Sequence, residues 1–452
     1  MKNAACCLLC NLEPIHQFSL LLMRAYQRLF QGLALLLPFP QPRKLIGAGA
    51  LRSLPAQMRG RRWQRPLLVT NHQLLQLQLP QPLLQELEAD GRTCRLFDQV
   101  PDNPTLACVE AGLQAYREGH CDSLVAVGGG SVIDCAKAIG ARAANPWLSC
   151  RAMEGLFRVV LPPPPLACVP TTAGSGSEAS IAAVLTDGQR QRKLAIADLK
   201  LLPKITVIDP ELMLGLPPAI TAAGGLDALT HAVEAYIGRG GTPFSNRRAL
   251  DATAAITRWL PRAYSHGDDL EARLQMALAA HAAGEAFTRT NVGYAHALAH
   301  ALGCAYGIPH GLANALVLPS VLRFSLPACE PRLAALALAA GLGTSQDSDQ
   351  RLARDFINWV VALNQQLGVP PLIAPLRSID IPRISADALK EAHPAYPVPR
   401  LMGRSDCEAL LTQLLPDAAS PSGAWFRSTS PPTAGSPQEE SSPRGKRRRH
   451  GH

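Results

Sequence analysis

Two short stretches of the sequence hold residues whose types and spacing suit a metal ion. In GGLDALTHAVEAY, Asp227 and His231 lie four residues apart in a helical pattern, so both side chains point from one face. In HALAHALGCAYGIPHG, His296 and His300 are again four apart. The glycines and the proline that follow end this second helix and allow His310 to fold back toward it.

One carboxylate with three imidazoles is a ligand set for Fe(II) or Zn(II), whereas calcium and magnesium would require more oxygen ligands. Spacing alone does not decide which histidines of the second stretch bind, because His296 and His300 form as good a ligand pair as any other. The alternative is that each histidine is a hydrogen-bonded core residue or a cation at a helix end. Two helical pairs of metal-ligand types favour the metal site.

Two glycine-rich loops predict a phosphate-binding crevice. In VGGGSVIDCAKAIG a buried strand is followed by Gly129, Gly130 and Ser131, where a helix begins. Glycines allow the backbone to approach a pyrophosphate, and a helix N-terminus presents unpaired N–H groups to it. The second loop, PTTAGSGSE, places Thr171 and Thr172 after another buried strand. Neither loop matches the GxGxxG dinucleotide fingerprint.

The elements that must position these residues change character along the chain. Buried strands at residues 65–70, 123–127, 166–170 and 205–208 alternate with helices, which predicts a parallel α/β sheet. After residue 212, runs rich in Ala and Leu at helical spacing predict an all-helical domain. We therefore expect an N-terminal amphipathic extension at residues 1–40 and an α/β nucleotide-binding domain at 41–212. A helical metal-binding domain should follow at 213–416, and a disordered basic tail at 417–452.

The charge is concentrated at the two ends of the chain. The net charge of the 452 residues is +9, but residues 1–44 hold five Lys or Arg and one Glu, and residues 417–452 hold six Lys or Arg and three Asp or Glu. The rest carries only +2, so nothing in the body of the protein indicates a nucleic-acid partner. The 12 cysteines do not form the pattern of a disulfide framework, which indicates reduced thiols and a cytoplasmic location.

Residues 18–37 are apolar enough to raise the question of a membrane segment. A polar stripe argues against a spanning helix: Arg24, Gln27, Arg28 and Gln31. We expect an amphipathic helix that docks on protein, and no integral membrane association. Its apolar face consists of Leu20, Leu21, Met23, Leu29, Phe30, Leu33 and Leu36.

The four motifs together resemble the iron-containing (group III) alcohol dehydrogenases, over residues 41–416 and with the ethanolamine-utilisation branch as the nearest. The resemblance implies a Rossmann-like α/β domain and an all-helical C-terminal domain, the dehydroquinate synthase-like architecture, with the site in the cleft between them. By matching positions it assigns the metal to Asp227, His231, His296 and His310. It places His300 beside the nicotinamide and the substrate, as the catalytic residue outside the metal shell.

The same resemblance assigns the cofactor contacts: Asn71, Asn103, Gly129, Gly130, Ser131, Thr171, Thr172, Ser180 and Lys193. Asn71 departs from the family pattern. Many relatives carry Asp in a VTD sequence there, where it holds the ribose and repels a 2′-phosphate, but this chain reads VTNH. Asparagine does not repel that phosphate, so the resemblance leaves both NAD and NADP as cofactors.

The implied activity is a metal-dependent, NAD(P)-linked oxidation of a primary alcohol to its aldehyde by a homodimer, with Fe(II), or Zn(II) in its place. One alternative is a polyol dehydrogenase of the glycerol type, against which His231 argues. A second is a lyase of the dehydroquinate-synthase type, which would form no net NADH. A third is a non-catalytic subunit of a larger assembly, against which the intact ligand set argues.

Overall fold

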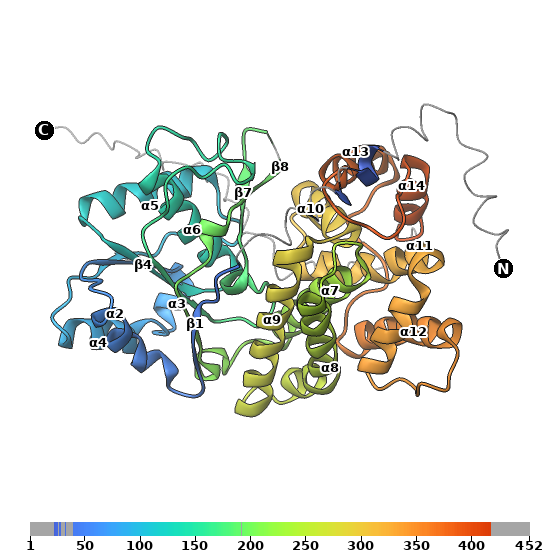
Figure 1. The fold of residues 1–452 in the computed structure, drawn as a ribbon, viewed down its shortest axis with the longest axis horizontal. Coiled ribbons are helices and arrows are strands. Elements are labelled where there is room, and N and C mark those ends of the chain that lie inside the picture. The colour runs from blue at the N-terminus through green and yellow to red at the C-terminus, as the bar shows by residue number, and fades with distance from the viewer. Residues whose placement is uncertain (1–21, 26, 29–31, 33–38, 191, 417–452) are drawn as a thin grey trace, which may run out of the picture.

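The computed structural model describes residues 22–25, 27, 28, 32, 39–190 and 192–416. The expected basic tail at 417–452 lies outside the described residues. So does most of the expected N-terminal extension. The described chain forms a sheet-containing region followed by a helical region, side by side in Figure 1. The expected fold class is confirmed by this arrangement.

The main sheet has six parallel strands in the order β1-β9-β6-β4-β2-β3. Their bounds are β1 Arg43–Ile46, β2 Pro66–Val69, β3 Arg95–Phe97, β4 Ser123–Gly128, β6 Leu166–Pro170 and β9 Ile205–Ile208. The four expected strands are the inner strands β2, β4, β6 and β9, whose residues are all buried. The edge strands β1 and β3 are short and partly exposed, so their apolar signal is weak.

Helices cover both faces of this sheet, which explains the continuous apolar runs of the inner strands. On β4, Leu124 and Ala126 pack toward α5 (Leu106–Glu118) and α6 (Gly130–Ala144). Val125 and Val127 pack on the other face, toward α2 (Leu54–Arg59) and α4 (Gln81–Ala89). The alternation follows from the two-residue period of a strand.

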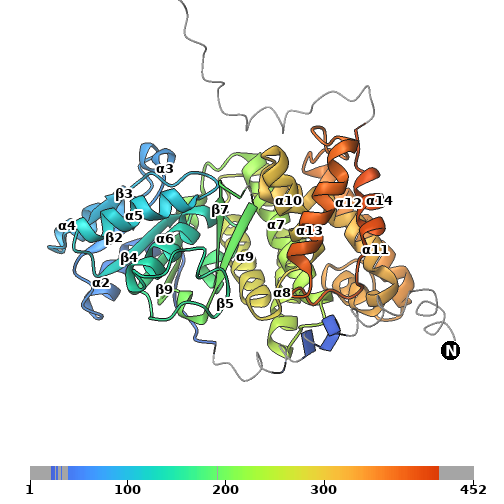
Figure 2. The ribbon, with the colours of Figure 1, turned by 90° about the horizontal axis from the view of Figure 1, so that it is seen from above.

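A small second sheet was not expected from the sequence. Its strands are β5 (Gly155–Leu156), β8 (Arg192–Ala197) and β7 (Ala182–Asp187), with β7 and β8 antiparallel. Leu185, Leu194 and Ile196 of this sheet join the core that α5 and α6 form. The sheet thus covers that side of the α/β region, and in Figure 2 its strand β7 lies between α6 and the helical region.

The helical region runs from α7 to α14. Its helices are α7 Pro218–Ile237, α8 Pro243–Ser265, α9 Leu270–Thr290, α10 Tyr294–Tyr306, α11 His310–Ala339, α12 Asp349–Gln366, α13 Ile381–Ala392 and α14 Arg404–Thr412. Among the described helices, α11 alone is long and apolar enough to cross a membrane, but 67% of that window is buried within the protein. Its apolar residues belong to the core of the helical region.

Glycines allow the second loop of the α/β region to lie directly on the helical region. A Cβ on Gly174 would lie 2.8 Å from Cα of Gly224 in α7, and one on Gly176 would lie 2.7 Å from Cα of Gly284 in α9. Gly176 also has φ +59, a conformation that side-chain-bearing residues rarely adopt. The loop can therefore approach both helices only without side chains at these positions.

Candidate metal and cofactor site

The expected metal ligands come together between α7, α10 and α11. Asp227 and His231 lie on adjacent turns of α7, His296 lies in the first turn of α10, and His310 begins α11. Asp227, His231 and His296 each offer a ligand atom within 4.8 Å of the others, and all three are buried. The Asp227 Oδ1 atom lies 3.4 Å from Nε2 of His310 and 3.9 Å from Nε2 of His296. His310 lies beside these three residues, and its side chain is 39% exposed.

Buried nitrogen atoms at this site have no protein partner, as a metal site requires. Nδ1 of His231 and Nε2 of His296 are buried without a hydrogen bond. A buried polar atom without a partner costs about 1–3 kcal/mol, and a bound cation would remove that cost. The donor set of one carboxylate and imidazole nitrogens fits Fe(II) or Zn(II).

The protonation states favour the same conclusion. Burial lowers the pKa of His231 to about 3 and that of His296 to about 4, and the pKa of the more exposed His310 is lowered as well. Burial opposes ionisation of Asp227, but the neighbouring imidazoles and Asn314 outweigh it and hold its pKa below the usual range. At neutral pH the site therefore offers neutral imidazole lone pairs around an ionised carboxylate.

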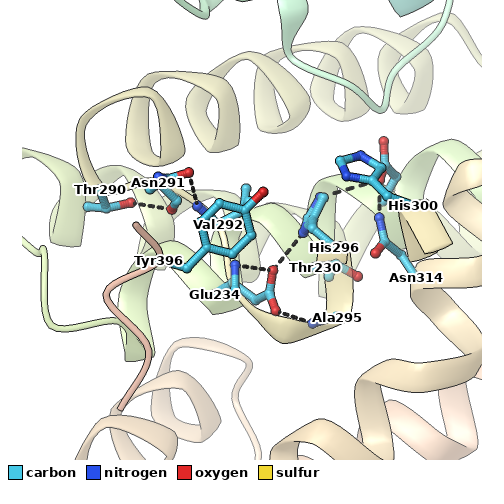
Figure 3. Close-up of polar contacts among 12 residues, drawn as sticks. Thr230, Glu234, Thr290, Asn291, Val292, Ala295, His296, His300, Asn314 and Tyr396 are labelled. Atoms are coloured by element: carbon cyan, nitrogen blue, oxygen red, sulfur yellow. Dashed lines mark hydrogen bonds and ion pairs between the residues drawn. The ribbon is translucent and has the colours of Figure 1, made fainter. Parts of the chain in front are cut away.

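Glu234, one turn beyond His231 on α7, fixes the orientation of His296 (Figure 3). Its carboxylate lies 2.6 Å from Nδ1 of His296 and accepts hydrogen bonds from the backbone N–H groups of Gly293 and Ala295. Burial raises the pKa of Glu234 to about 7, although these N–H donors act in the opposite direction. With Nδ1 bound to Glu234, Nε2 of His296 is left to face Asp227.

Asn314, one turn into α11, supports the other side of the site. Its Nδ2 atom donates to Oδ1 of Asp227 at 2.8 Å and lies 3.2 Å from Nε2 of His310. We did not single out Glu234 or Asn314 from the sequence. The signal was present, because each follows a ligand histidine at helical spacing, in HAVE and in HGLAN.

His300 lies beside the ligands but has a partner of its own. Its ring stacks on His310 with 5.0 Å between the centroids, and its Nδ1 atom lies 2.7 Å from Oε1 of Glu391. Tyr396 donates its hydroxyl hydrogen to the same oxygen at 2.7 Å. Burial opposes ionisation of Glu391, but His300 and Tyr396 outweigh it and lower its pKa. Glu391 therefore engages one of the two ring nitrogens of His300.

The two glycine-rich loops lie together at the carboxyl ends of the neighbouring strands β4 and β6, where ligands of open α/β sheets bind. Gly129 precedes the first turn of α6, and a Cβ on Gly130 would lie 2.7 Å from Oγ of Ser175. A Cβ on Gly129 would lie 3.2 Å from Oγ1 of Thr172. Side chains at both glycines would therefore fill the space between the loops.

The remaining expected cofactor residues are held in hydrogen bonds within the protein. Nζ of Lys193 on β8 donates to Oδ1 of Asn103 at 2.6 Å, and Ser131 donates to the carbonyl of Asp102. These contacts connect the loop before α5 to both the small sheet and the start of α6. Asn71 caps α3 (His72–Gln76), because its Oδ1 accepts from the N–H of Leu74 at 2.8 Å.

Thr171 and Ser180 are more enclosed than a direct cofactor contact suggests. Thr171 is 1% exposed and Ser180 is 2% exposed. The hydroxyl of Ser180 lies 3.0 Å from Nζ of Lys137, which also donates to the carbonyls of Ser177, Ser180 and Ala182. Lys137 thus supports the second loop from inside, a role that we did not predict.

Comparison with known proteins identifies the family. Residues 41–210 match the family model described as "Iron-containing alcohol dehydrogenase", and residues 221–415 match "Fe-containing alcohol dehydrogenase family, C-terminal". The chain belongs to the iron-containing alcohol dehydrogenase family. The family expected from the sequence motifs is thereby confirmed, and so is the expected enzyme class, an oxidoreductase.

The individual relatives extend across most of the chain. The sequence is 38% identical over 327 residues to "Probable alcohol dehydrogenase EutG" of Salmonella typhimurium, covering 72% of this chain and 81% of that one. It is 34% identical over 332 residues to "NAD-dependent methanol dehydrogenase" of Bacillus methanolicus, covering 74% and 87%. A solved 1,3-propanediol oxidoreductase superposes with a TM-score of 0.81 at 35% identity, covering 84% of this chain and 99% of that one.

Proposed function

We propose that this chain interconverts a small primary alcohol and its aldehyde with a nicotinamide cofactor, around a divalent ion held by Asp227, His231, His296 and His310. The observation that carries the proposal is the buried group of Asp227, His231 and His296, whose ligand atoms lie within 4.8 Å of one another and in which each histidine has a ring nitrogen without a hydrogen bond. The relatives named for methanol and propanediol support a small alcohol as the substrate. When bound, the ion supplies Lewis-acid polarisation of the substrate oxygen.

The side chains of the site have separate tasks in the reaction. The alcohol loses a hydride to the nicotinamide and a proton to the protein, which gives an aldehyde, the reduced cofactor and H⁺. His300 is placed to carry that proton, because Glu391 engages its Nδ1 atom and leaves Nε2 as the acceptor. The Glu391 carboxylate then stabilises the protonated ring.

The cofactor residues act mainly by positioning. The N–H groups at the start of α6 and the close approach allowed by Gly129 and Gly130 suit a pyrophosphate. Thr172, Ser131, Asn103 and Lys193 surround the same crevice through the loop contacts described above. We assign Thr171 and Ser180 to the support of the second loop, through backbone or through Lys137.

The choice between NAD and NADP rests on Asn71 in this proposal. NAD is the preferred cofactor and NADP is also used, because no carboxylate at this position repels a 2′-phosphate. Asn71→Asp should sharpen the preference for NAD by about 1–3 kcal/mol. Asp is as good a helix N-cap as Asn, so the substitution keeps the cap on α3. An unchanged ratio of kcat/KM for the two cofactors would place the ribose contact elsewhere.

We further infer a cytoplasmic homodimer. All cysteines among the described residues are unpaired, as a reducing compartment leaves them. Light scattering of the purified protein measures the oligomeric state, and a monomeric mass would contradict the inference.

The activity is tested with protein purified under anaerobic conditions and analysed for bound iron and zinc. A panel of short-chain alcohols is then assayed with NAD and with NADP, and formation of the reduced cofactor is followed by absorbance. Net formation of NADH that depends on the alcohol and on the metal would support the proposal. A metal-loaded protein that forms no reduced cofactor with any alcohol, and reduces no aldehyde, would contradict it.

A further inference from the structure

The described part of the N-terminal segment, residues 22–25, 27 and 28, contacts the loop that follows α13. The two guanidinium nitrogens of Arg24 donate to the carbonyls of Val398 at 2.7 Å and Pro399 at 3.1 Å. Gln27 donates through Nε2 to the carbonyls of Pro394 at 3.0 Å and Tyr396 at 2.8 Å. The segment precedes both stretches that match the family models. In Figure 1 it is the dark blue piece beside α13.

The contact is built from polar side chains, whereas we expected the apolar face of the segment to dock. Gln27 is 6% exposed and Leu22 is 56% exposed. Apart from Met23, the residues of the expected apolar face lie outside the described residues. Arg24 also donates to Oε1 of Gln27 at 2.8 Å, so the two side chains hold each other in position.

The geometry of the loop makes this contact a substantial constraint. Prolines at 394, 397 and 399 remove backbone donors, so the loop cannot form a regular hydrogen-bonding ladder. Four of its carbonyls instead accept from Arg24 and Gln27. Burial lowers the pKa of Arg24 to about 10, which leaves it charged at neutral pH. Hydrogen bonds from a charged donor are roughly twice as strong as neutral ones.

The loop carries a residue that reaches the active site. The backbone carbonyl of Tyr396 accepts from Gln27, and its side-chain hydroxyl donates to Glu391 at 2.7 Å. Glu391 in turn lies 2.7 Å from Nδ1 of His300. A continuous set of hydrogen bonds therefore runs from the N-terminal segment to the imidazole that we assign to proton transfer.

We propose that Arg24 and Gln27 are positioning residues for His300. They fix the loop at residues 394–399, so that Tyr396 and Glu391 hold the His300 ring in one orientation beside the metal ligands. The inference rests on the role proposed for His300. It assigns a catalytic purpose to a segment that lies outside the family's shared domains. The metal ligands and the cofactor loops do not depend on these contacts.

The test compares the double variant Arg24→Ala/Gln27→Ala with Arg28→Ala, a control that removes an exposed arginine from the same segment. In the double variant, amide hydrogen exchange in peptides covering residues 391–402 should accelerate, and kcat should fall on the order of 10-fold. Metal content and the KM for the cofactor should stay as in the parent. Arg28→Ala should behave as the parent does in all four measurements. Arg24→Lys, which keeps a charged donor, should recover part of the lost kcat.

A second comparison separates this inference from the proposed function. Placed in a His300→Ala background, the double substitution should lower kcat no further, because the residue that it positions is already absent. An equal loss of kcat in both backgrounds would overturn the inference. So would a double variant with parental kcat while His300→Ala is inactive. If His300→Ala itself keeps full activity, the role proposed for His300 fails first.

Discussion

Two clusters of histidine and carboxylate differ in what balances their charge: one lies within the helical region, and the other lies where β1 and the second loop meet α9. The metal cluster consists of Asp227, His231, His296 and His310. The ion-pair cluster consists of Lys44, Glu178, His281 and Glu285. In the ion-pair cluster, Nζ of Lys44 lies 2.5 Å from Glu285, and Nδ1 of His281 lies 3.1 Å from Glu178. Arg248 adds a second cation, 2.9 Å from Glu285.

The same residue types therefore adopt opposite charge states in the two clusters. Burial by itself lowers the pKa of His281, but contacts with Glu178 and Glu285 outweigh it, so its pKa is raised. In the metal cluster burial prevails, and the pKa of His231 falls to about 3. In the ion-pair cluster, Nε2 of His281 has no hydrogen bond, but it lies 3.5 Å from Oε1 of Glu285. This cluster connects β1, the second cofactor loop and α9. In the metal cluster, Nδ1 of His231 and Nε2 of His296 have no hydrogen bond, and burial keeps both imidazoles neutral at neutral pH.

Removal of the carboxylate from the metal cluster should have the largest effect on kcat/KM and on metal content. Asp227→Asn keeps the shape of the side chain but removes the one carboxylate among the four proposed ligands. The loss of several kcal/mol of transition-state stabilisation corresponds to a fall in kcat/KM of about 10³-fold. Metal content and kcat/KM are measured together. Asp227→Asn protein that keeps full metal occupancy would show that this carboxylate is not a ligand.

Loss of the residue that orients His296 should have a smaller effect. Glu234→Gln keeps the size of the side chain but no longer favours the N–H on Nδ1 of His296. Substitution of such partners weakens metal binding by about 10–100-fold. Equilibrium competition with a chelator measures the change in affinity. An affinity equal to that of the parent would mean that the backbone alone orients His296.

A substitution in the ion-pair cluster should lower the stability of the protein and leave its activity unchanged. Glu285→Gln removes the carboxylate that Lys44 and Arg248 share, and both cations are partly exposed. We therefore expect a loss of about 2 kcal/mol in the free energy of unfolding, less than for a fully buried pair. Denaturant titration and metal analysis are carried out on the same preparation. Loss of metal without loss of stability would remove the distinction between the clusters.

The two clusters should also give opposite pH trends in metal-free protein. Because the pKa of His281 is raised in the fold, its protonated form stabilises the protein below about pH 6.5, and this contribution is lost as the pH rises through the folded value. The pKa of His231 is lowered in the fold, so stability is lost as the pH falls below about 6.5, the pKa of an unperturbed histidine. The destabilisation caused by His281→Gln should therefore shrink as the pH rises. That caused by His231→Gln should grow. Unfolding free energies across this range provide the comparison, and parallel trends would contradict it.

Local sequence patterns predicted the inner strands, the glycine-rich loops and the candidate ligand pairs on α7 and α10, because each of these is encoded within a short stretch of chain. It could not reveal partners from distant segments. Glu234 lies 62 residues from His296, and Glu391 lies 91 residues from His300. The same reason applies to Arg24, whose acceptor Val398 is 374 residues away. The small sheet was missed because β5 has only two residues and because β7 and β8 contain alanine and charged residues, which are uncommon in strands.

The most direct test of the metal assignment is metal analysis of two variants, each of which lacks one histidine of a stacked pair. His310→Ala removes a proposed ligand, and His300→Ala removes its neighbour, whose ring centroid is 5.0 Å away. We predict that His310→Ala loses most of its metal and most of its turnover. His300→Ala should lose turnover but keep its metal. Equal loss of metal in both variants would contradict the division between ligand and proton carrier, and full metal in His310→Ala would contradict the site itself.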